Sequence, residues 1–419
     1  MDRLDERSLI FDWAEVGPRR AQWPGRVMLD DETLRDGLQS PSVIDPPVET
    51  KVAILHLMES LGIETADVGL PGAGQRQREA VTRLCREIAD QRLRIRPNCA
   101  ARTLMVDIQP IAEVTQLTGV PIEACLFIGS SPIRQYAEEW RLEHILRHSQ
   151  EAVGFAVKEG LEVMYVTEDT IRSSPDHLRV LLTAAIEAGA KRVCLCDTVG
   201  AAVPEGVFNL VTWVRNLITE LGVDVGIDWH GHRDRGLDLA NTLAAIQAGT
   251  TRVHGTALGI GERVGNTPME QLLVNLKLLG LRDDDLTRLP EYVEVVSKAT
   301  GVPVPVNTPI VGRDTFRTAT GVHAAAVIKA QHKGNSWLAD RVYSGVPASW
   351  VGRAQEIEVG PMSGGSNVVY YLSTRGWLNS PEVVQAVLLA AKRSPRILTE
   401  DEIREIVRSI EASQGKPLE

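Results

Sequence analysis

Short runs of apolar or β-branched residues recur eight times within the first 256 residues, and stretches with helical spacing of apolar residues separate most of them. Alternation of strand and helix favours parallel βαβ units, because each helix returns the chain to start the next strand in the same direction. Eight parallel strands are the number that closes a barrel. The expected strands are residues 27–31, 64–69, 94–99, 122–128, 162–167, 192–197, 225–230 and 251–256.

We therefore predict an α/β fold built on a (β/α)8 TIM barrel. Such a barrel takes about 250 residues, so the 419 residues of this chain leave room for a second part. The segment 301–312 carries three prolines and is expected to be an extended linker. Residues 1–300 should form the barrel, and residues 301–419 the linker and a C-terminal, mostly helical subdomain. The expected helices are residues 48–61, 76–88, 144–159, 175–188, 207–221, 269–279, 323–330, 381–392 and 399–412.

The composition is that of a folded, acidic protein. Hydrophobic residues make up 43% and charged residues 24% of the chain, which argues against disorder. A net charge of −10 makes nucleic acid an unexpected partner, and no apolar run approaches the roughly 20 residues that span a membrane.

Two features bear on the location of the protein. Asp2, Asp5 and Glu6 lie where a signal peptide would be basic. The five cysteines are scattered along the chain, as in a reducing compartment. We expect a cytoplasmic protein.

Cys194 and Cys196 alternate along the expected strand 192–197, so both side chains should point to one face. No second cysteine pair is present in the sequence to complete a thiolate metal site. We interpret the two cysteines as small residues of the core.

His230 and His232 lie two residues apart at the end of the expected strand 225–230, so both imidazoles should face the same side. Two imidazoles and a carboxylate are a common ligand set for a divalent cation. We predict that Asp36, in the polar segment after the first strand, supplies the carboxylate. The carboxyl ends of all strands meet at one face of a barrel, which would bring the two segments together. A histidine pair alone also occurs at structural positions, so the prediction depends on all three residues.

Several motifs together resemble those of a family of metal-dependent barrel enzymes that includes 2-isopropylmalate synthase, homocitrate synthase, citramalate synthase and hydroxymethylglutaryl-CoA lyase. The resemblance extends from about residue 27 to residue 375. It implies that a 2-oxo acid is joined to the methyl carbon of acetyl-CoA and that the thioester is then hydrolysed. The motifs are Thr33-Leu-Arg-Asp-Gly-Leu-Gln39, Val68-Gly-Leu-Pro71, Glu168-Asp-Thr-Ile-Arg-Ser173, Asp197-Thr-Val-Gly200, His230-Gly-His-Arg-Asp234, Gly259-Ile-Gly-Glu-Arg-Val-Gly-Asn266 and Gly321-Val-His323.

The resemblance implies that Asp36, His230 and His232 hold a divalent cation, with Asn266 as a further ligand. The cation would bind the 2-oxo acid through its carboxylate and ketone oxygens and act as a Lewis acid. Mixed oxygen and imidazole ligation suits Zn²⁺, Mn²⁺ and Mg²⁺ alike. Acetyl-CoA would be the co-substrate. Its expected contacts in the glycine-rich loop are Gly259, Gly261 and Glu262.

Further residues occupy positions that are catalytic in the synthases. Arg35 would stabilise negative charge on the reacting oxygen, although an arginine beside an aspartate is also often a simple ion pair. Glu168 would orient His323, which takes the methyl proton; a packing role is the alternative for His323. Tyr343 would act in the barrel of a neighbouring subunit, so the resemblance implies a homodimer. A half-buried packing role is the alternative for Tyr343.

Arg102 and Ser130 lie at strand ends that face the substrate in relatives, and Thr198 lies at another strand end. Thr198 is a candidate to hydrogen-bond the carboxylate of the 2-oxo acid. Arg102 would pair with a distal carboxylate, which favours a dicarboxylic acceptor such as 2-oxoglutarate. The same arginine occurs in relatives with apolar substrates, so the acceptor stays open.

Departures from the synthase pattern leave two alternatives. Leu38 stands where most synthases have Glu, and the lyase also has Leu there, which favours cleavage of a carbon–carbon bond. Against the lyase, the loop 259–266 lacks the cysteine that the lyase carries. Residues 316–320 differ from the polar residues that usually precede His323. That difference leaves a non-catalytic metal-binding barrel as the second alternative.

Overall fold

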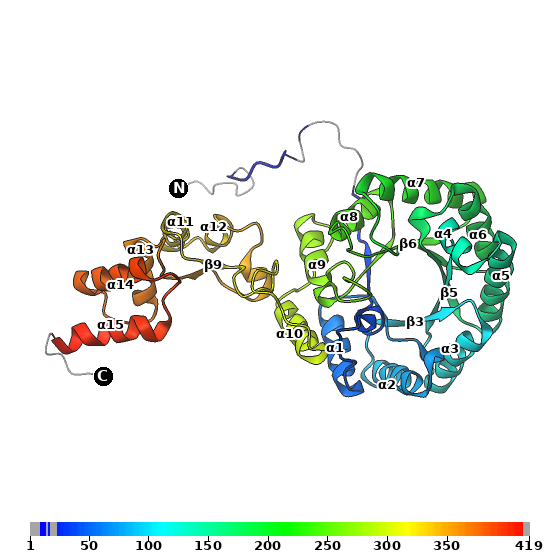
Figure 1. Cartoon of the computed structure of the whole chain (residues 1–419), viewed down its shortest axis with the longest axis horizontal. Coiled ribbons are helices and arrows are strands. Elements are labelled where there is room, and N and C mark those ends of the chain that lie inside the picture. Colours follow the sequence, from blue (N-terminus) through cyan, green and yellow to red (C-terminus); the bar gives the residue numbers. More distant parts are fainter. Residues whose placement is uncertain (1–8, 14–15, 17–22, 414–419) are drawn as a thin grey trace. The chain divides into compact units, whose positions relative to one another are not determined.

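Eight parallel strands close into a barrel in the computed structural model, which describes residues 9–13, 16 and 23–413 (Figure 1). The first strand pairs with both the second and the eighth, and this double pairing closes the sheet. Each strand lies where the sequence predicted it, so the TIM-barrel fold is confirmed. The strands are β1 (Met28–Asp31), β2 (Thr65–Asp67), β3 (Arg96–Arg102), β4 (Glu123–Gly129), β5 (Glu162–Glu168), β6 (Arg192–Asp197), β7 (Gly226–Gly231) and β8 (Arg252–Gly255).

Helices surround the barrel (Figure 1). The helices predicted between strands are present; α5, for example, buries Ile145 and Val153 on one face and exposes charged residues on the other. The sequence did not predict α3, which contains Pro110, because a proline inside a helix removes a backbone donor and usually interrupts the pattern. The helices of the barrel unit are α1 (Val48–Ser60), α2 (Gln75–Gln91), α3 (Met105–Thr118), α4 (Pro132–Glu138), α5 (Leu142–Lys158), α6 (Pro175–Glu187), α7 (Pro204–Leu221), α8 (Asp238–Ala248) and α9 (Met269–Leu278).

The chain divides into two compact units. The first comprises Met1–Asp283 with Ala299–Gly301 and holds the barrel; the second comprises Asp284–Lys298 with Val302–Glu419. The predicted boundary at residue 300 stays a prediction. No helix in the described part of the chain is both long and apolar enough to cross a membrane. The acidic residues Asp2, Asp5 and Glu6 lie outside the described residues.

The second unit has its own small core, formed by buried residues of α13, α14 and α15 such as Val368, Val387 and Ile403. Two reciprocal hydrogen bonds cap the start of α15. Thr399 N donates to Glu402 Oε2 at 2.7 Å, and Glu402 N donates to Thr399 Oγ1 at 3.3 Å. A two-stranded parallel sheet accompanies the helices. The elements are α10 (Leu289–Thr300), β9 (Arg317–Thr318), α11 (Gly321–His332), α12 (Ser336–Arg341), β10 (Glu356–Ile357), α13 (Gly365–Thr374), α14 (Pro381–Arg393) and α15 (Glu400–Ser413).

A buried ionic cluster lies inside the barrel, near the amino ends of the strands. Arg252, at the start of β8, contacts Asp228 of β7 and lies 2.5 Å from Glu123, at the start of β4. Burial acts to raise the pKa of Asp228, but Arg252 and Arg192 hold it well below its usual value. The cluster therefore joins three strands through charges that are largely shielded from water, since Arg252 and Asp228 are buried and the Glu123 side chain is 13% exposed.

Arg252→Met should lower the free energy of unfolding by about 3–5 kcal/mol, because Glu123 loses its contact with Arg252 and the buried Asp228 keeps only Arg192 and His254. Urea denaturation, followed by circular dichroism, measures the change. Arg94→Met is the control, since the Arg94 side chain is 88% exposed and its ion pair with Glu59 should contribute less than about 1 kcal/mol. Equal effects of the two substitutions would contradict the stabilising role of the cluster.

Candidate active site

The side chains of Asp36, His230 and His232 converge at the carboxyl end of the barrel. Asp36 begins a short 3-10 helix after β1, and the two histidines lie at the end of β7 and directly after it. One ligand atom from each residue lies within 4.8 Å of the others, and the two Nε2 atoms are 3.1 Å apart. All three residues are buried. The structure thus brings together the three residues that the sequence predicted as metal ligands.

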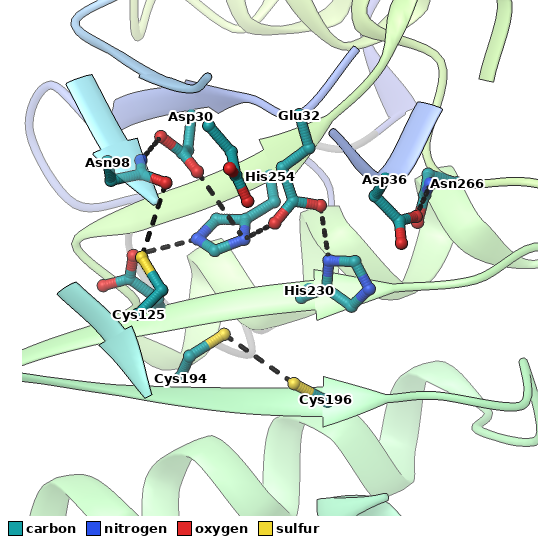
Figure 2. Close-up of polar contacts among 12 residues, drawn as sticks. Asp30, Glu32, Asp36, Asn98, Cys125, Cys194, Cys196, His230, His254 and Asn266 are labelled. Carbon is teal, nitrogen blue, oxygen red and sulfur yellow. Dashed lines mark hydrogen bonds and ion pairs between the residues drawn. The ribbon is translucent and has the colours of Figure 1, made fainter. Parts of the chain in front are cut away.

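The second ring nitrogen of each histidine also has a partner. His230 Nδ1 lies 2.7 Å from Glu32 Oε2 (Figure 2), and His232 Nδ1 lies 3.2 Å from the carbonyl oxygen of Gly265. When Nδ1 donates its hydrogen to these oxygens, the lone pair of Nε2 is left for a metal. Burial and the neighbouring His230 lower the pKa of His232 to about 4, so its ring is neutral at neutral pH. A neutral imidazole is the form that binds a metal.

Asn266 lies against Asp36 (Figure 2). Its Nδ2 donates to Asp36 Oδ2 and, at 3.1 Å, to the carbonyl oxygen of Ile260. Its Oδ1 is buried and has no hydrogen-bond partner in the described part of the chain. A buried amide oxygen without a partner costs free energy unless a ligand occupies it. A carboxylate, two imidazoles and this amide oxygen fit a divalent cation such as Zn²⁺, Mn²⁺ or Mg²⁺.

The glycine-rich loop shapes the surroundings of Asn266. Gly261 has a φ of +147°, and a Cβ atom there would collide with Asn266 Nδ2 and lie 2.9 Å from Asp36 Oδ2. Gly259, with a φ of +61°, accepts a hydrogen bond from Asn266 N at 2.9 Å. Both glycines thus position Asn266 beside Asp36. Their predicted contact with acetyl-CoA stays a prediction.

Carboxylates surround Arg35. Its guanidinium group lies 2.6 Å from Asp67, 3.0 Å from Asp36 and 3.2 Å from Glu32. Burial acts to lower the pKa of Arg35, but these carboxylates raise it well above its usual value. The site therefore holds a permanent positive charge directly beside Asp36, which suits a reaction in which an oxygen becomes negative.

The sequence reasoning missed Glu32, Asp67 and His254. Glu32 joins two histidines, because its Oε2 faces His230 and its Oε1 lies 3.0 Å from His254 Nδ1 (Figure 2). Burial acts to raise the pKa of Glu32, but the two histidines hold it well below its usual value. His254 Nε2 in turn lies 2.9 Å from Asp228. The signal for His254 was an ionisable residue inside the expected strand 251–256.

A cavity of about 270 Å³ lies at these residues. Glu168, Thr198 and Glu262, each predicted as a site residue, also line it. Burial raises the pKa of Glu168, and Arg134 Nε lies 3.8 Å from its carboxylate. Thr198 Oγ1 accepts a hydrogen bond from Asp169 N at 2.8 Å. Asp36, His230 and His232 therefore share one cavity with Arg35 and Glu168.

Two predicted substrate residues do not line this cavity. The Arg102 side chain is 60% exposed and pairs with Asp107 through Nε at 2.6 Å and Nη2 at 2.9 Å. Ser130 is buried; its Oγ donates to the carbonyl oxygen of Glu168 at 2.9 Å and lies 2.8 Å from Ser173 Oγ. The polar groups of both side chains thus contact other residues of the protein, and neither side chain lines the cavity.

His323 and Tyr343 belong to the second unit. Their rings lie together, with centroids 4.3 Å apart and an angle of 31° between the planes. His323 is exposed in the first turn of α11, and Tyr343 is 48% exposed. Neither ring belongs to the core of that unit. Their catalytic roles stay predictions.

Fold and site together define a class: TIM-barrel proteins with a candidate divalent-cation centre at the carboxyl ends of the strands. Residues 26–296 match the family model described as HMGL-like. A probable 2-isopropylmalate synthase of Ignicoccus hospitalis is 33% identical over 409 residues, which cover 96% of each chain. A homocitrate synthase of Methanopyrus kandleri is 33% identical over 404 residues, covering 95% of this chain and 96% of that protein. The chain therefore belongs to the HMGL-like family, and its resemblance to the synthases is confirmed.

Solved structures agree on the fold. An HMG-CoA lyase of Bacillus subtilis superposes with a TM-score of 0.57 and 21% identity, covering 68% of this chain and 97% of that one. At this identity the likeness supports the barrel fold and carries no argument about the reaction.

Asp36→Asn should weaken Mn²⁺ binding more than Glu32→Gln does. Loss of a partner that orients a ligand typically costs roughly 10- to 100-fold in metal affinity, which is the range expected for Glu32→Gln. Isothermal titration of the metal-free protein with Mn²⁺ measures both. Asp45→Asn is the control, because Asp45 forms ion pairs with Lys51 and Arg76, away from the cluster. Binding that is unchanged in both site variants would show that no metal is held here.

Gly261→Ala should reduce Mn²⁺ affinity at least about tenfold, because the added methyl group displaces Asn266 from Asp36. Gly236→Ala is the matched control: its φ of +67° is also unfavourable for alanine, but no atom lies within 4 Å of the added Cβ. Thermal melting separates backbone strain from loss of metal. Equal metal affinity in the two variants would exclude a role of the loop in the site.

Proposed function

We propose that this chain catalyses a Claisen-type condensation of acetyl-CoA with a 2-oxo acid, giving a 2-hydroxy diacid or triacid and CoA. The methyl carbon of acetyl-CoA loses a proton and bonds to the ketone carbon of the acceptor, and water then hydrolyses the thioester. Relatives named 2-isopropylmalate, homocitrate and citramalate synthase support this reaction. The observation that carries the proposal is the cluster of Asp36, His230 and His232 in a cavity that also holds Arg35 and Glu168.

Asp36, His230 and His232 would hold the cation, with Asn266 Oδ1 as a further ligand. A bound cation supplies Lewis acidity toward the carboxylate and ketone oxygens of a 2-oxo acid. Glu32 and Gly265 keep the two imidazoles turned so that Nε2 faces the centre of the cluster. These contacts fix the site before substrate binds, which lowers the reorganisation needed during the reaction.

Arg35 is proposed to stabilise the charge that forms on the ketone oxygen when the new bond closes. Its pairing with three carboxylates holds the guanidinium group in one position beside Asp36. Thr198, which lines the same cavity, has a hydroxyl hydrogen available to the carboxylate of the 2-oxo acid.

Glu168 is proposed to take part in proton transfer together with His323. Its carboxyl group lines the cavity, and burial raises its pKa toward the range useful for acid–base chemistry.

Other parts of the proposal rest on the resemblance and the composition. They are the roles of His323 and Tyr343, the acetyl-CoA contacts of Gly259, Gly261 and Glu262, a homodimeric state and a cytoplasmic location.

A lyase reaction is the second candidate, favoured by Leu38 at a position where the lyase also has Leu. The loop 259–266 contains no cysteine, which argues against it. Incubation with hydroxymethylglutaryl-CoA tests this candidate directly, since a lyase would form acetyl-CoA.

Thiol release from acetyl-CoA should depend on an added 2-oxo acid and on a divalent metal. Glu168→Gln should lower kcat by roughly 100-fold or more, because the amide cannot exchange a proton. Glu162→Gln is the control, since Glu162 is exposed at the opposite end of the same strand. Absence of thiol release with every 2-oxo acid, in protein shown to bind metal, would refute the condensation.

A further inference from the structure

The inner wall of the barrel has two chemically different sides. The side formed by β7, β8 and the region of β1 and β2 presents charged and polar residues, among them His230, His254 and Asp67. The opposite side, formed by β3 to β6, carries Glu168 at the carboxyl end of β5. Below Glu168 this side presents small, apolar or sulfur-containing side chains to the cavity. These are Ala100, Cys125, Phe127, Met164, Val166, Cys194 and Cys196.

The apolar side results from the alternation of side chains along a strand, in which every second residue points into the barrel. Cys125 and Phe127 alternate on β4, Met164 and Val166 on β5, and Cys194 and Cys196 on β6, so each pair faces inward. The sulfur atoms of the last pair lie 3.8 Å apart (Figure 2). Cys125, Met164, Cys194 and Cys196 form one buried cluster, against which Val166 packs.

The apolar side, called the apolar wall from here on, extends from the level of the candidate metal site toward the amino ends of the strands. Cys196 pairs in register with His230, whereas Cys194 pairs with Asp228, two residues nearer the amino ends. Two residues of a strand span about 7 Å. The cavity therefore offers apolar surface from the level of His230 down toward the ionic cluster around Arg252.

A second carboxylate on the acceptor would find no free cation among the lining residues. The lining arginines are Arg35, which pairs with three carboxylates, and Arg263, which pairs with Asp234 at 2.9 Å. His254 lies between Glu32 and Asp228. Arg102, the residue that would have favoured a dicarboxylic acceptor, pairs with Asp107 and does not line the cavity.

We propose that the acceptor is a 2-oxo acid with an uncharged, apolar side chain of several carbon atoms, which packs on the wall formed by β3 to β6. This assignment rests on the proposed condensation. The 2-oxo and carboxylate oxygens lie on the polar side at Asp36, His230 and His232, and the side chain points to the sulfur-rich side. A methyl group would leave the lower part of the wall uncovered. A carboxylate buried there would find no free cation, because Arg252, 3.2 Å from Met164 Sδ, already pairs with Asp228 and Glu123.

The test is a panel of 2-oxo acids assayed for thiol release with acetyl-CoA and Mn²⁺. It contains pyruvate, 3-methyl-2-oxobutanoate, 4-methyl-2-oxopentanoate, 2-oxooctanoate, phenylpyruvate, oxaloacetate and 2-oxoglutarate. At least one of the larger apolar acids should exceed both dicarboxylic acids and pyruvate in kcat/KM by about tenfold or more, as expected for added apolar contact. A preference for oxaloacetate, 2-oxoglutarate or pyruvate would overturn the assignment and leave the condensation intact.

Met164→Ala probes the wall itself. The shortened side chain should raise the ratio of kcat/KM for 2-oxooctanoate to that for 3-methyl-2-oxobutanoate by about tenfold. Met58→Ala is the matched control, because Met58 is equally buried but lies in α1 and does not line the cavity. An unchanged ratio in Met164→Ala, with a melting temperature no lower than that of Met58→Ala, would overturn the placement of the acceptor side chain. Failure of every acid in the panel would instead refute the condensation.

Discussion

The carboxylate of Glu32 is the contact on which the site depends, because it ties the candidate metal ligands to the interior of the barrel. It faces His230 on one side and His254 on the other (Figure 2). His254 in turn contacts Asp228, which contacts Arg252. Buried charges are tolerated only when each has a partner, so these groups fix one another. Turning His230 away from the cluster would break a chain of buried contacts.

This arrangement explains why the barrel must close for the site to exist. Glu32 follows β1 and His254 lies on β8, and the two strands pair with Asp30 opposite His254. The glycine-rich loop after β8 then brings Asn266 to Asp36, where Gly261 leaves room for the contact. Residues more than 200 positions apart in the chain thus meet because one pair of strands completes the sheet.

The sequence predicted the strands well, because short apolar or β-branched runs alternate with stretches that have helical spacing. It also predicted the cluster of Asp36, His230 and His232, since these residues lie at strand ends. Glu32 and His254 were missed because their contact depends on the register between β1 and β8, which no local pattern specifies. The alternation of Cys194 and Cys196 was predicted, but their place on a cavity wall depends on which strands form the opposite side.

A closed barrel also places the ligands of the candidate cation and the surface proposed to contact the acceptor side chain at different levels of the same strands. Strand ends and loops supply the ligands of the candidate cation and the charge of Arg35, whereas the middle of β4, β5 and β6 supplies uncharged surface below them. Because inward positions repeat every second residue, a substitution at one of them alters the surface without moving Asp36 or the histidines. The relatives of this chain are named for different products, which are 2-isopropylmalate, homocitrate and citramalate. Variation on this wall is a physical route by which one barrel with one candidate metal site accommodates them.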